Sequence, residues 1–433
     1  MSDVSYVRTE MLPEREPPMA QSGIFKWVRE NLFGSVTDSV LTILSIWFLY
    51  TLLAGILPWI FQSSWTAHSL GECREAIKAA YGEHTEGACW AVINERFLQL
   101  IFGFYPSELY WRPILAFILM LAAIAPVLFQ SIPRKMLWLS AVYPFLGFWL
   151  YWGGTIWMPI SALAGFAIAW AAVQFLSERL GTLGATLAAI FGPIIWWLFL
   201  AGPVAGILAG IIPIELEFVE SSKFGGFMLS IIIGVTGIAL SLPIGVLLAL
   251  GRQSNLLIVK SLCVGFIEFV RGVPLITLLF VASVLLNYFL PPGTVFDIIL
   301  RVMIMVTLFA AAYMAEVIRG GLAALPKGQY EGADSLGLDY WQAQRLIIMP
   351  QALKISIPGI VSTFIGVFKD TTLVSIISMF DPIGLSNAIR ADTAWNGVYW
   401  ELFIFIGAVF FVFCFSMSRY SMYLERKLQT GHR

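Results

Sequence analysis

The chain has 433 residues, of which 59% are hydrophobic and only 12% are charged. A soluble protein carries roughly 25% charged residues, so this composition excludes a soluble domain and indicates a protein with many membrane spans. The sequence contains 26 Lys and Arg against 27 Asp and Glu, which leaves a net charge of −1 and no basic field for binding nucleic acid.

Apolar runs that could cross about 30 Å of hydrocarbon recur along the whole chain. They predict an all-α polytopic membrane protein with about ten transmembrane helices. One run contains Gly192-Pro193 and Gly202-Pro203, so it is either one kinked helix or two half-spans. The predicted spans are Leu41–Phe61, Pro113–Gln130, Leu137–Trp152, Thr155–Leu176, Gly184–Ile212, Phe227–Leu250, Pro274–Leu290, Ile299–Ile318, Ile357–Phe380 and Trp400–Met417.

Basic residues orient these spans, because loops rich in Lys and Arg stay in the cytoplasm. If Gly184–Ile212 crosses once, the segments around Arg134, Arg179, Arg252 and Arg345 and the basic tail all fall on one side. Two half-spans would place the tail outside. We therefore expect a single kinked crossing, with both termini in the cytoplasm.

The spans fall into two groups with a connector between them. We expect a cytoplasmic arm at 1–40, a membrane region of about five helices at 41–214 and a periplasmic loop within it at 62–112. A periplasmic connector at 215–226, a second membrane region at 227–424 and a cytoplasmic tail at 425–433 follow. No internal repeat relates the halves, which argues against a transporter built from inverted repeats in one chain.

The outer loop holds Cys73 and Cys89 in what would be an oxidising compartment. We predict a disulfide between them, with two unpaired thiols as the alternative. The three histidines are scattered along the sequence, so we expect no metal site. The sequence contains no P-loop and no hydrolase motif, so a transport cycle would take its energy from another polypeptide or from an ion gradient.

A cytoplasmic loop at 319–356 carries the most informative pattern. Its residues predict a short helix from Gln329, a turn at Gly337 and a second helix that Asp339 caps and that stops at Pro350. Two such helices could dock in the groove of a partner, or could rest on lipid headgroups as an ordinary amphipathic loop. The residues alone leave both possibilities open.

This loop resembles the E-A-A-x₃-G-x₉-I-x-L-P loop of the membrane subunits of binding-protein-dependent ABC importers. Gly332 stands in place of an Ala and Met349 in place of a Leu, which are mild departures. The residues that match the pattern at the right spacing are Glu331, Ala333, Gly337, Ile347 and Pro350.

Flanking segments resemble the permeases of polar amino acids, with Val273 in place of their usual Thr. The resemblance covers about Phe227 to Arg426, roughly half of the chain. The additional spans and the Cys73/Cys89 loop resemble the larger membrane subunit of general L-amino-acid importers. The flanking motif residues are Glu268 and Arg271, Glu316 and Arg319, and Lys369, Asp370, Thr371 and Thr372.

The resemblance implies a five-helix type I ABC importer core at 227–424, in a bacterial inner membrane. This half-pore would pair with a homologous permease subunit, receive an amino acid from a periplasmic binding protein and dock its coupling loop on a cytoplasmic ATPase dimer. That dimer would use the ATP and Mg²⁺, so this chain would be no enzyme and bind no cofactor. The alternatives are an ion-coupled secondary transporter of small polar solutes and a non-transporting scaffold.

Lys369 and Asp370 would lie near the middle of a span that starts at Ile357. An ionisable group at that depth costs roughly 2.5–3.5 kcal/mol, so each needs a partner. A zwitterionic amino acid could offer its carboxylate to Lys369 and its ammonium to Asp370, with a hydroxyl from Thr371 or Thr372. Pairing with charges on neighbouring helices is the alternative, and both remain open.

Overall fold

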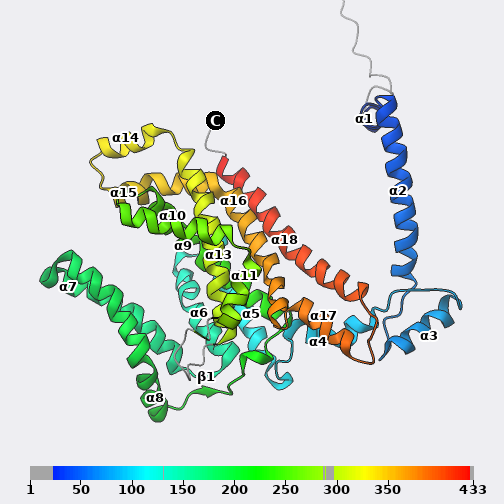
Figure 1. Cartoon of the computed structure of the whole chain (residues 1–433), viewed down its shortest axis with the longest axis horizontal. Helices are drawn as coiled ribbons and strands as arrows, with labels where there is room; N and C mark the ends of the chain where they lie inside the picture. Colours follow the sequence, from blue (N-terminus) through cyan, green and yellow to red (C-terminus); the bar gives the residue numbers. More distant parts are fainter. Residues whose placement is uncertain (1–22, 130, 286–287, 289–296, 430–433) are drawn as a thin grey trace, which may run out of the picture. The chain divides into compact units, whose positions relative to one another are not determined.

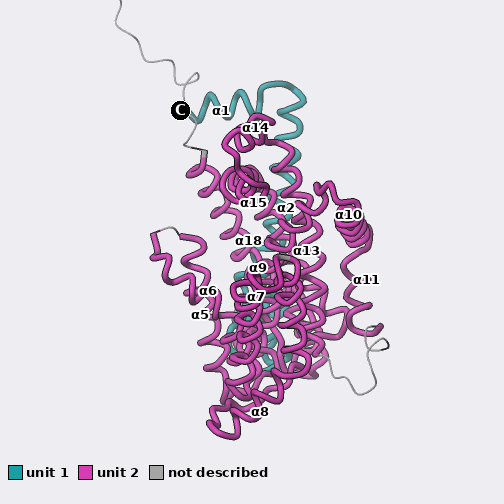
Figure 2. Tube along the Cα trace, turned by 90° about the vertical axis from the view of Figure 1, so that its left-hand side faces the viewer, with its two compact units in different colours: residues 1–91 teal, residues 92–433 magenta. Residues whose placement is uncertain are grey.

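The computed structural model describes residues 23–129, 131–285, 288 and 297–429 (Figure 1). Most of the predicted arm 1–40, the end of the predicted span Pro274–Leu290 and the last residues of the tail 425–433 lie outside these ranges. The chain divides into two compact units, residues 1–91 and residues 92–433 (Figure 2).

The first unit contains one membrane-length helix and a disulfide-bonded loop. The short helix α1 (Gly23–Leu32) precedes α2 (Val36–Phe61), which is long and apolar enough to cross a membrane. The loop helix α3 (Leu70–Tyr81) begins at Ser69, whose hydroxyl accepts a hydrogen bond from the backbone N–H of Glu72. A disulfide joins Cys73 to Cys89 and closes the loop after α2.

The second unit begins with a helix pair and a long helical hairpin. α5 packs along α6, and the short antiparallel ribbon of β1 and β2 joins the two ends of the hairpin. The elements of this part are α4 (Ala91–Phe102), η2 (Ser107–Leu109), α5 (Trp111–Leu128), η3 (Arg134–Met136), α6 (Leu137–Trp152), β1 (Gly154–Thr155), α7 (Trp157–Ile195), η4 (Trp196–Leu200), α8 (Ala201–Ile211), β2 (Glu215–Leu216) and η5 (Ser221–Lys223).

The apolar run Gly184–Ile212, which contains two Gly-Pro pairs, forms one continuous helix. Gly181 has a φ of +70° and breaks α7, so that a second membrane-length helix runs over Leu183–Ile211. The π-helical turn η4 follows Pro193 and keeps the helix continuous, because it shifts the hydrogen-bond register where proline lacks an N–H. A continuous helix of this length is what a single crossing requires.

The remaining elements form the C-terminal core, in which α9, α13, α16 and α18 pack in succession (Figure 1). They are α9 (Gly226–Gln253), α10 (Leu257–Gly272), α11 (Leu275–Phe280), η6 (Val281–Leu285), α13 (Ile298–Ala323), α14 (Lys327–Ser335), α15 (Tyr340–Ala343), η7 (Gln344–Ile348), α16 (Met349–Asp370), η8 (Thr371–Ile377), α17 (Pro382–Ala391) and α18 (Trp400–Gln429).

The described residues confirm an all-α membrane fold. Eight helices are long and apolar enough to span a membrane, and the pair α10–α11, bent by 102°, would make a ninth. Helix α6 lies on a predicted span but has only 16 residues. Small residues bring α9 and α13 together: a Cβ on Gly245 would lie 2.7 Å from the Cβ of Met314. Close backbone approach of this kind is the usual way that helices associate in lipid.

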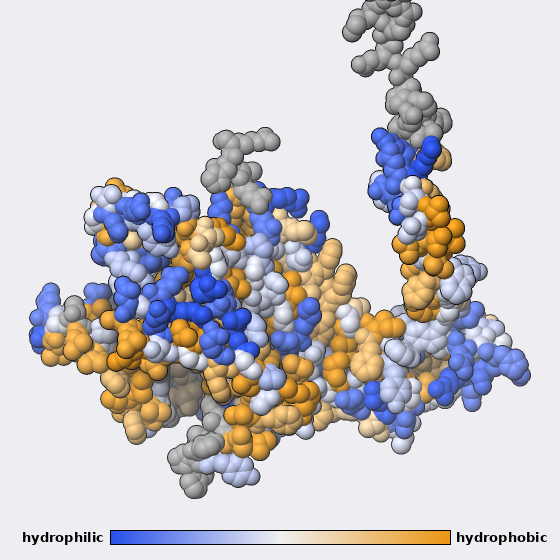
Figure 3. Space-filling view, turned by 45° about the horizontal axis from the view of Figure 1, so that its top comes forward, coloured by the Kyte–Doolittle hydropathy of each residue, from blue (hydrophilic) through white to orange (hydrophobic). Residues whose placement is uncertain are grey.

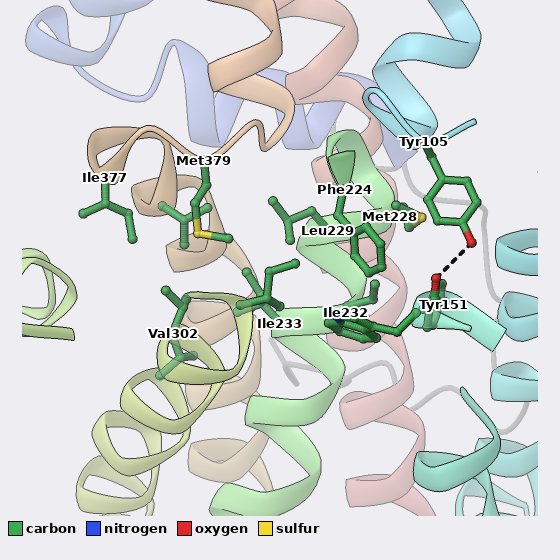
Figure 4. Close-up of a cluster of buried hydrophobic side chains, with 14 of the residues drawn as sticks. Tyr105, Tyr151, Phe224, Met228, Leu229, Ile232, Ile233, Val302, Ile377 and Met379 are labelled. Atoms are coloured by element: carbon green, nitrogen blue, oxygen red, sulfur yellow. Dashed lines mark hydrogen bonds between the residues drawn. The ribbon is translucent and has the colours of Figure 1, made fainter. Parts of the chain in front are cut away.

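Residues 92–225 share a hydrophobic core with the C-terminal helices (Figure 4). The Tyr105 hydroxyl donates to the Tyr151 carbonyl at 2.9 Å, and the ring of Phe224 lies against both tyrosines. The same cluster includes Leu229 on α9. The structure therefore packs α5 and α6 against the C-terminal core, whereas the sequence groups them with the first span.

Candidate functional site

The predicted coupling loop forms two short helices at one end of the core (Figure 1). Gly337 separates them with a φ of +69°, a left-handed conformation that favours glycine. Asp339 then starts α15 with a capping box: its carboxylate accepts from the Gln342 N–H at 2.8 Å, and the Gln342 side chain accepts from the Asp339 N–H.

The predicted stop at Pro350 is wrong. The helix that starts at Tyr340 continues through the π-helical turn η7 into α16, and Pro350 lies in the first turn of α16. Proline is tolerated there because the π-turn changes the hydrogen-bond register just before it. The loop helix is therefore a rigid extension of a membrane helix that ends at Ile377.

Two kinds of contact fix α14 on the start of α16. The Gln351 side-chain amide donates to the Gln329 side-chain oxygen at 2.8 Å. Ala333 and Ile348 are almost fully buried, and Tyr330 packs against the same apolar cluster as Ile348. The two loop helices are thus held as one body with the membrane helix that follows.

The outward face of the loop is exposed and mixed in character. Leu336, Trp341 and Leu346 are each more than 60% exposed, and Glu331 is exposed beside them. Figure 3 shows hydrophilic residues gathered over this end of unit 2 and hydrophobic residues along the helix flanks. Apolar side chains surrounded by polar ones on a protruding element are typical of a docking surface.

Beneath the loop, four motif residues of α10 and α13 form one ionic cluster with Arg252 of α9. Glu316 on α13 is its centre and is only 17% exposed. Its carboxylate lies 2.8 Å from the guanidinium of Arg252, 3.1 Å from that of Arg319 and 3.7 Å from that of Arg271. Glu268 pairs with Arg252 at 2.8 Å. The cluster ties α9, α10 and α13 together next to the bend between α10 and α11.

Arg252 is the member that motif matching overlooked. It ends α9, whereas the four predicted residues lie on α10 and α13. The contact exists because the chain turns back between α9 and α10, so that residues 16 apart in sequence meet. The sequence offered one signal for this ion pair: a basic residue near the end of a span, followed by an acidic residue on the next helix.

Lys369 and Asp370 form the second charged site, at the other end of α16. Within the described residues neither has an ion-pair partner; Lys369 is exposed and Asp370 half-buried. The Thr371 and Thr372 hydroxyls donate to the carbonyls of Phe368 and Lys369. Both hydroxyls are therefore already bonded within α16 and η8.

The packing of α16 places this pair along the helical core, and its predicted depth in the membrane stays a prediction. A Cβ on Gly234 would lie 2.9 Å from the ring of Phe368, so residues 368–371 stand level with Gly234. Gly234 follows the start of α9 at Gly226 by eight residues, or about 12 Å of helix. Lys369 and Asp370 thus lie in the third of the core farthest from the coupling loop, because α16 begins earlier than Ile357.

The chain is similar to known transport proteins over its whole length. Residues 241–430 match the family described as "Binding-protein-dependent transport system inner membrane component". The chain is 58% identical to the glutamate/glutamine/aspartate/asparagine transport system permease protein BztC of Rhodobacter capsulatus, over 100% of both chains. It belongs to the family of amino-acid ABC transporter permeases.

A second permease and a solved structure show the extent of the likeness. The inner membrane amino-acid ABC transporter permease protein YhdY of Escherichia coli is 41% identical over 97% of both chains. A crystal structure of an amino acid ABC transporter with histidines matches 46% of this permease and 91% of that chain, with 28% identity and a TM-score of 0.42.

Proposed function

We propose that this permease forms one half of the pore of an ATP-driven importer for acidic and amide amino acids, from the periplasm to the cytoplasm. The substrate class follows from that of BztC, the relative that is 58% identical over the full length and is named for glutamate, glutamine, aspartate and asparagine transport. The unpaired cation of Lys369 and anion of Asp370 support a zwitterionic substrate, whose two charged groups could complement both.

The observation that carries the proposal is the rigid, outward-facing coupling loop. Its exposed side chains Glu331, Leu336, Trp341 and Leu346 suit a groove on a cytoplasmic ATPase dimer. In this account the dimer binds ATP and Mg²⁺ and hydrolyses the nucleotide, and the permease is no enzyme and holds no cofactor. Movement of the groove would reach the far end of the pore through α16, because loop and helix are one body.

The remaining partners follow from the same account. A homologous permease subunit would complete the pore, and a periplasmic binding protein would deliver the substrate to the end that carries α17. The importer core would comprise residues 227–424. Residues 41–214 would form an additional membrane region, within which the loop 62–112 would be periplasmic, and 215–226 would connect the two.

Both termini would lie in the cytoplasm of a bacterial cell, with the permease in the inner membrane. The supporting observation is the excess of Lys and Arg at the coupling-loop end and in the tail. Membrane-impermeant thiol reagents test this orientation. Cys73 and Cys89 should react only after reduction and only from outside; reaction from the cytoplasmic side would overturn the topology.

Substituting Gly337 tests the coupling. Gly337→Val forces a β-branched residue into the left-handed region and should distort the turn that sets α14 against α15. We expect ATP-dependent uptake to fall by at least about tenfold in a complex that still reaches the membrane. Gly407→Val adds the same side chain on α18, where a Cβ meets open space, and should leave uptake unchanged. Full uptake and normal co-purification of the ATPase with Gly337→Val would contradict the docking.

A further inference from the structure

The helix α1, which the transport function does not use, is strongly two-sided. Ile24 and Trp27 are 80% and 58% exposed, so within its unit nothing covers them. The spacing of ten helical residues puts the apolar side chains within one arc and the charged ones opposite. The apolar side chains are Ile24, Phe25, Trp27, Val28 and Leu32, and the charged ones are Lys26, Arg29 and Glu30.

The one polar residue within the apolar arc is satisfied by its own helix. The side-chain amide of Asn31 donates to the backbone carbonyl of Trp27 at 2.9 Å. On the charged face, Lys26 lies 3.9 Å from Glu30, one helical turn away. The apolar arc therefore presents a hydrophobic strip, interrupted by an amide that is already bonded.

A tight corner fixes α1 to the end of the first span. A Cβ on Gly34 would lie 2.7 Å from the carbonyl oxygen of Glu30, so no other residue fits there without displacing α1. The Thr42 hydroxyl of α2 donates to the carbonyl of Leu32, the last residue of α1, at 2.7 Å. Ser35 caps α2 through the N–H of Asp38. Figure 2 shows α1 turning away from the line of α2.

We propose that α1 lies in the lipid headgroup layer at the N-terminal end of α2, with its apolar strip immersed in the boundary between headgroups and acyl chains. We infer that lipid covers the apolar strip, because α2 is apolar on all sides, has no buried residue and begins four residues after α1 ends. A helix held at a corner to such a span runs along the membrane surface. Its tryptophan and flanking basic residues suit that layer.

Spin-label accessibility measures this position in the full chain, assembled with its partners in nanodiscs of phosphatidylethanolamine and phosphatidylglycerol. Labels enter singly at Ile24→Cys and Lys26→Cys, in a background that carries Cys263→Ala and Cys414→Ala and keeps the disulfide. The label at position 24 should collide with oxygen in preference to a water-soluble nickel chelate, at a depth of about 5–10 Å. The label at position 26 should show the opposite preference.

Two results would overturn the proposal. Equal access of the nickel chelate to both labels would mean that α1 lies in water. Shielding of the position 24 label from both reagents would mean that a protein partner covers the strip.

The corner provides a matched pair of variants. Gly34→Val should abolish the oxygen preference at position 24, whereas Gly55→Val, whose added side chain meets open space within α2, should preserve it. Both variants should keep the coupling-loop function, because both substitutions lie outside that loop. An unchanged oxygen preference in Gly34→Val would contradict the claim that the corner holds α1 on the membrane.

Discussion

The two charged sites of the core differ in how their charges are balanced. At the coupling-loop end, three arginines and two glutamates from three helices pair with one another within the chain. At the other end of α16, Lys369 and Asp370 have no ion-pair partner within the part of the chain that the structure describes. Both sites match motifs of the same family, yet only the second leaves charges for an external group.

The difference separates residues that stabilise the helix packing from residues that could bind a substrate. An ionic cluster fixes the relative positions of the helices on which it lies, and each of its charges already has a partner of opposite sign. Open charges in a membrane are costly unless something else compensates them. The Glu316 cluster therefore holds α9, α10 and α13 next to the α10–α11 bend, and the proposal that Lys369 and Asp370 line the substrate path can be tested by substitution.

Removing the centre of the cluster should have the largest effect on stability. Glu316→Gln leaves Arg271 and Arg319 without their carboxylate in a site that is mostly shielded from water. We expect the free energy of unfolding to fall by on the order of 3 kcal/mol. Glu268→Gln is the matched control: its side chain is 54% exposed, so the loss should be below about 1 kcal/mol. Thermal unfolding of the purified complexes measures both losses. Equal losses would contradict the claim that Glu316 is the centre of the cluster.

Neutralising Asp370 should affect transport and spare stability. Asp370→Asn keeps the shape and removes the anion, so the loss of a charge-assisted contact with a substrate ammonium should raise the apparent KM by about tenfold or more. The melting temperature of the assembled complex should change little, because no partner inside the described chain is lost. Initial uptake rates across substrate concentrations give KM and kcat separately. An unchanged KM for every amino acid tested would take Asp370 out of the substrate path.

The smallest expected effect on stability concerns Asp381. Its carboxylate is stabilised in a third way, by backbone N–H groups. It caps α17, accepts from the N–H groups of Ile383 and Gly384, and is fully buried. Burial raises the pKa of the Asp381 carboxyl from 3.8 to about 6. Because the folded state then binds the proton more tightly than the unfolded chain, the stabilisation is complete below about pH 4 and is lost as pH rises through 6.

Between pH 5 and pH 7 the free energy of unfolding should therefore drop by roughly 1 kcal/mol on account of this group. Asp381→Asn retains the cap and should flatten that part of the pH profile. Unfolding curves at fixed salt across this range provide the test. A profile that stays equally steep in the variant would assign the titration elsewhere.

The sequence was informative where a pattern is local. Apolar runs located the spans, and Gly337 and Asp339 marked a left-handed turn and a helix cap from residue type alone. Pro350 misled because a proline predicts a helix end, and nothing in the sequence announced the π-turn that accommodates it. The predicted span accordingly began at Ile357, whereas α16 begins at Met349.

Local sequence patterns could not predict the contacts between distant segments. The partnership of Arg252 with Glu316 depends on how α9, α10 and α13 cross. The packing of Tyr105 and Phe224 on the core likewise joined residues 92–225 to the C-terminal helices, although composition alone grouped them with α2. Family motifs identified four of the five cluster residues, but not that they form ion pairs with one another.

The energy source of uptake tests the central claim most directly. The complex of this permease with its partner permease, ATPase and binding protein is reconstituted in liposomes, and uptake of labelled L-glutamate is followed. We predict uptake that requires ATP on the ATPase side and the binding protein on the other, and that persists when ionophores collapse all ion gradients. Uptake driven by a proton or sodium gradient without ATP would contradict the account.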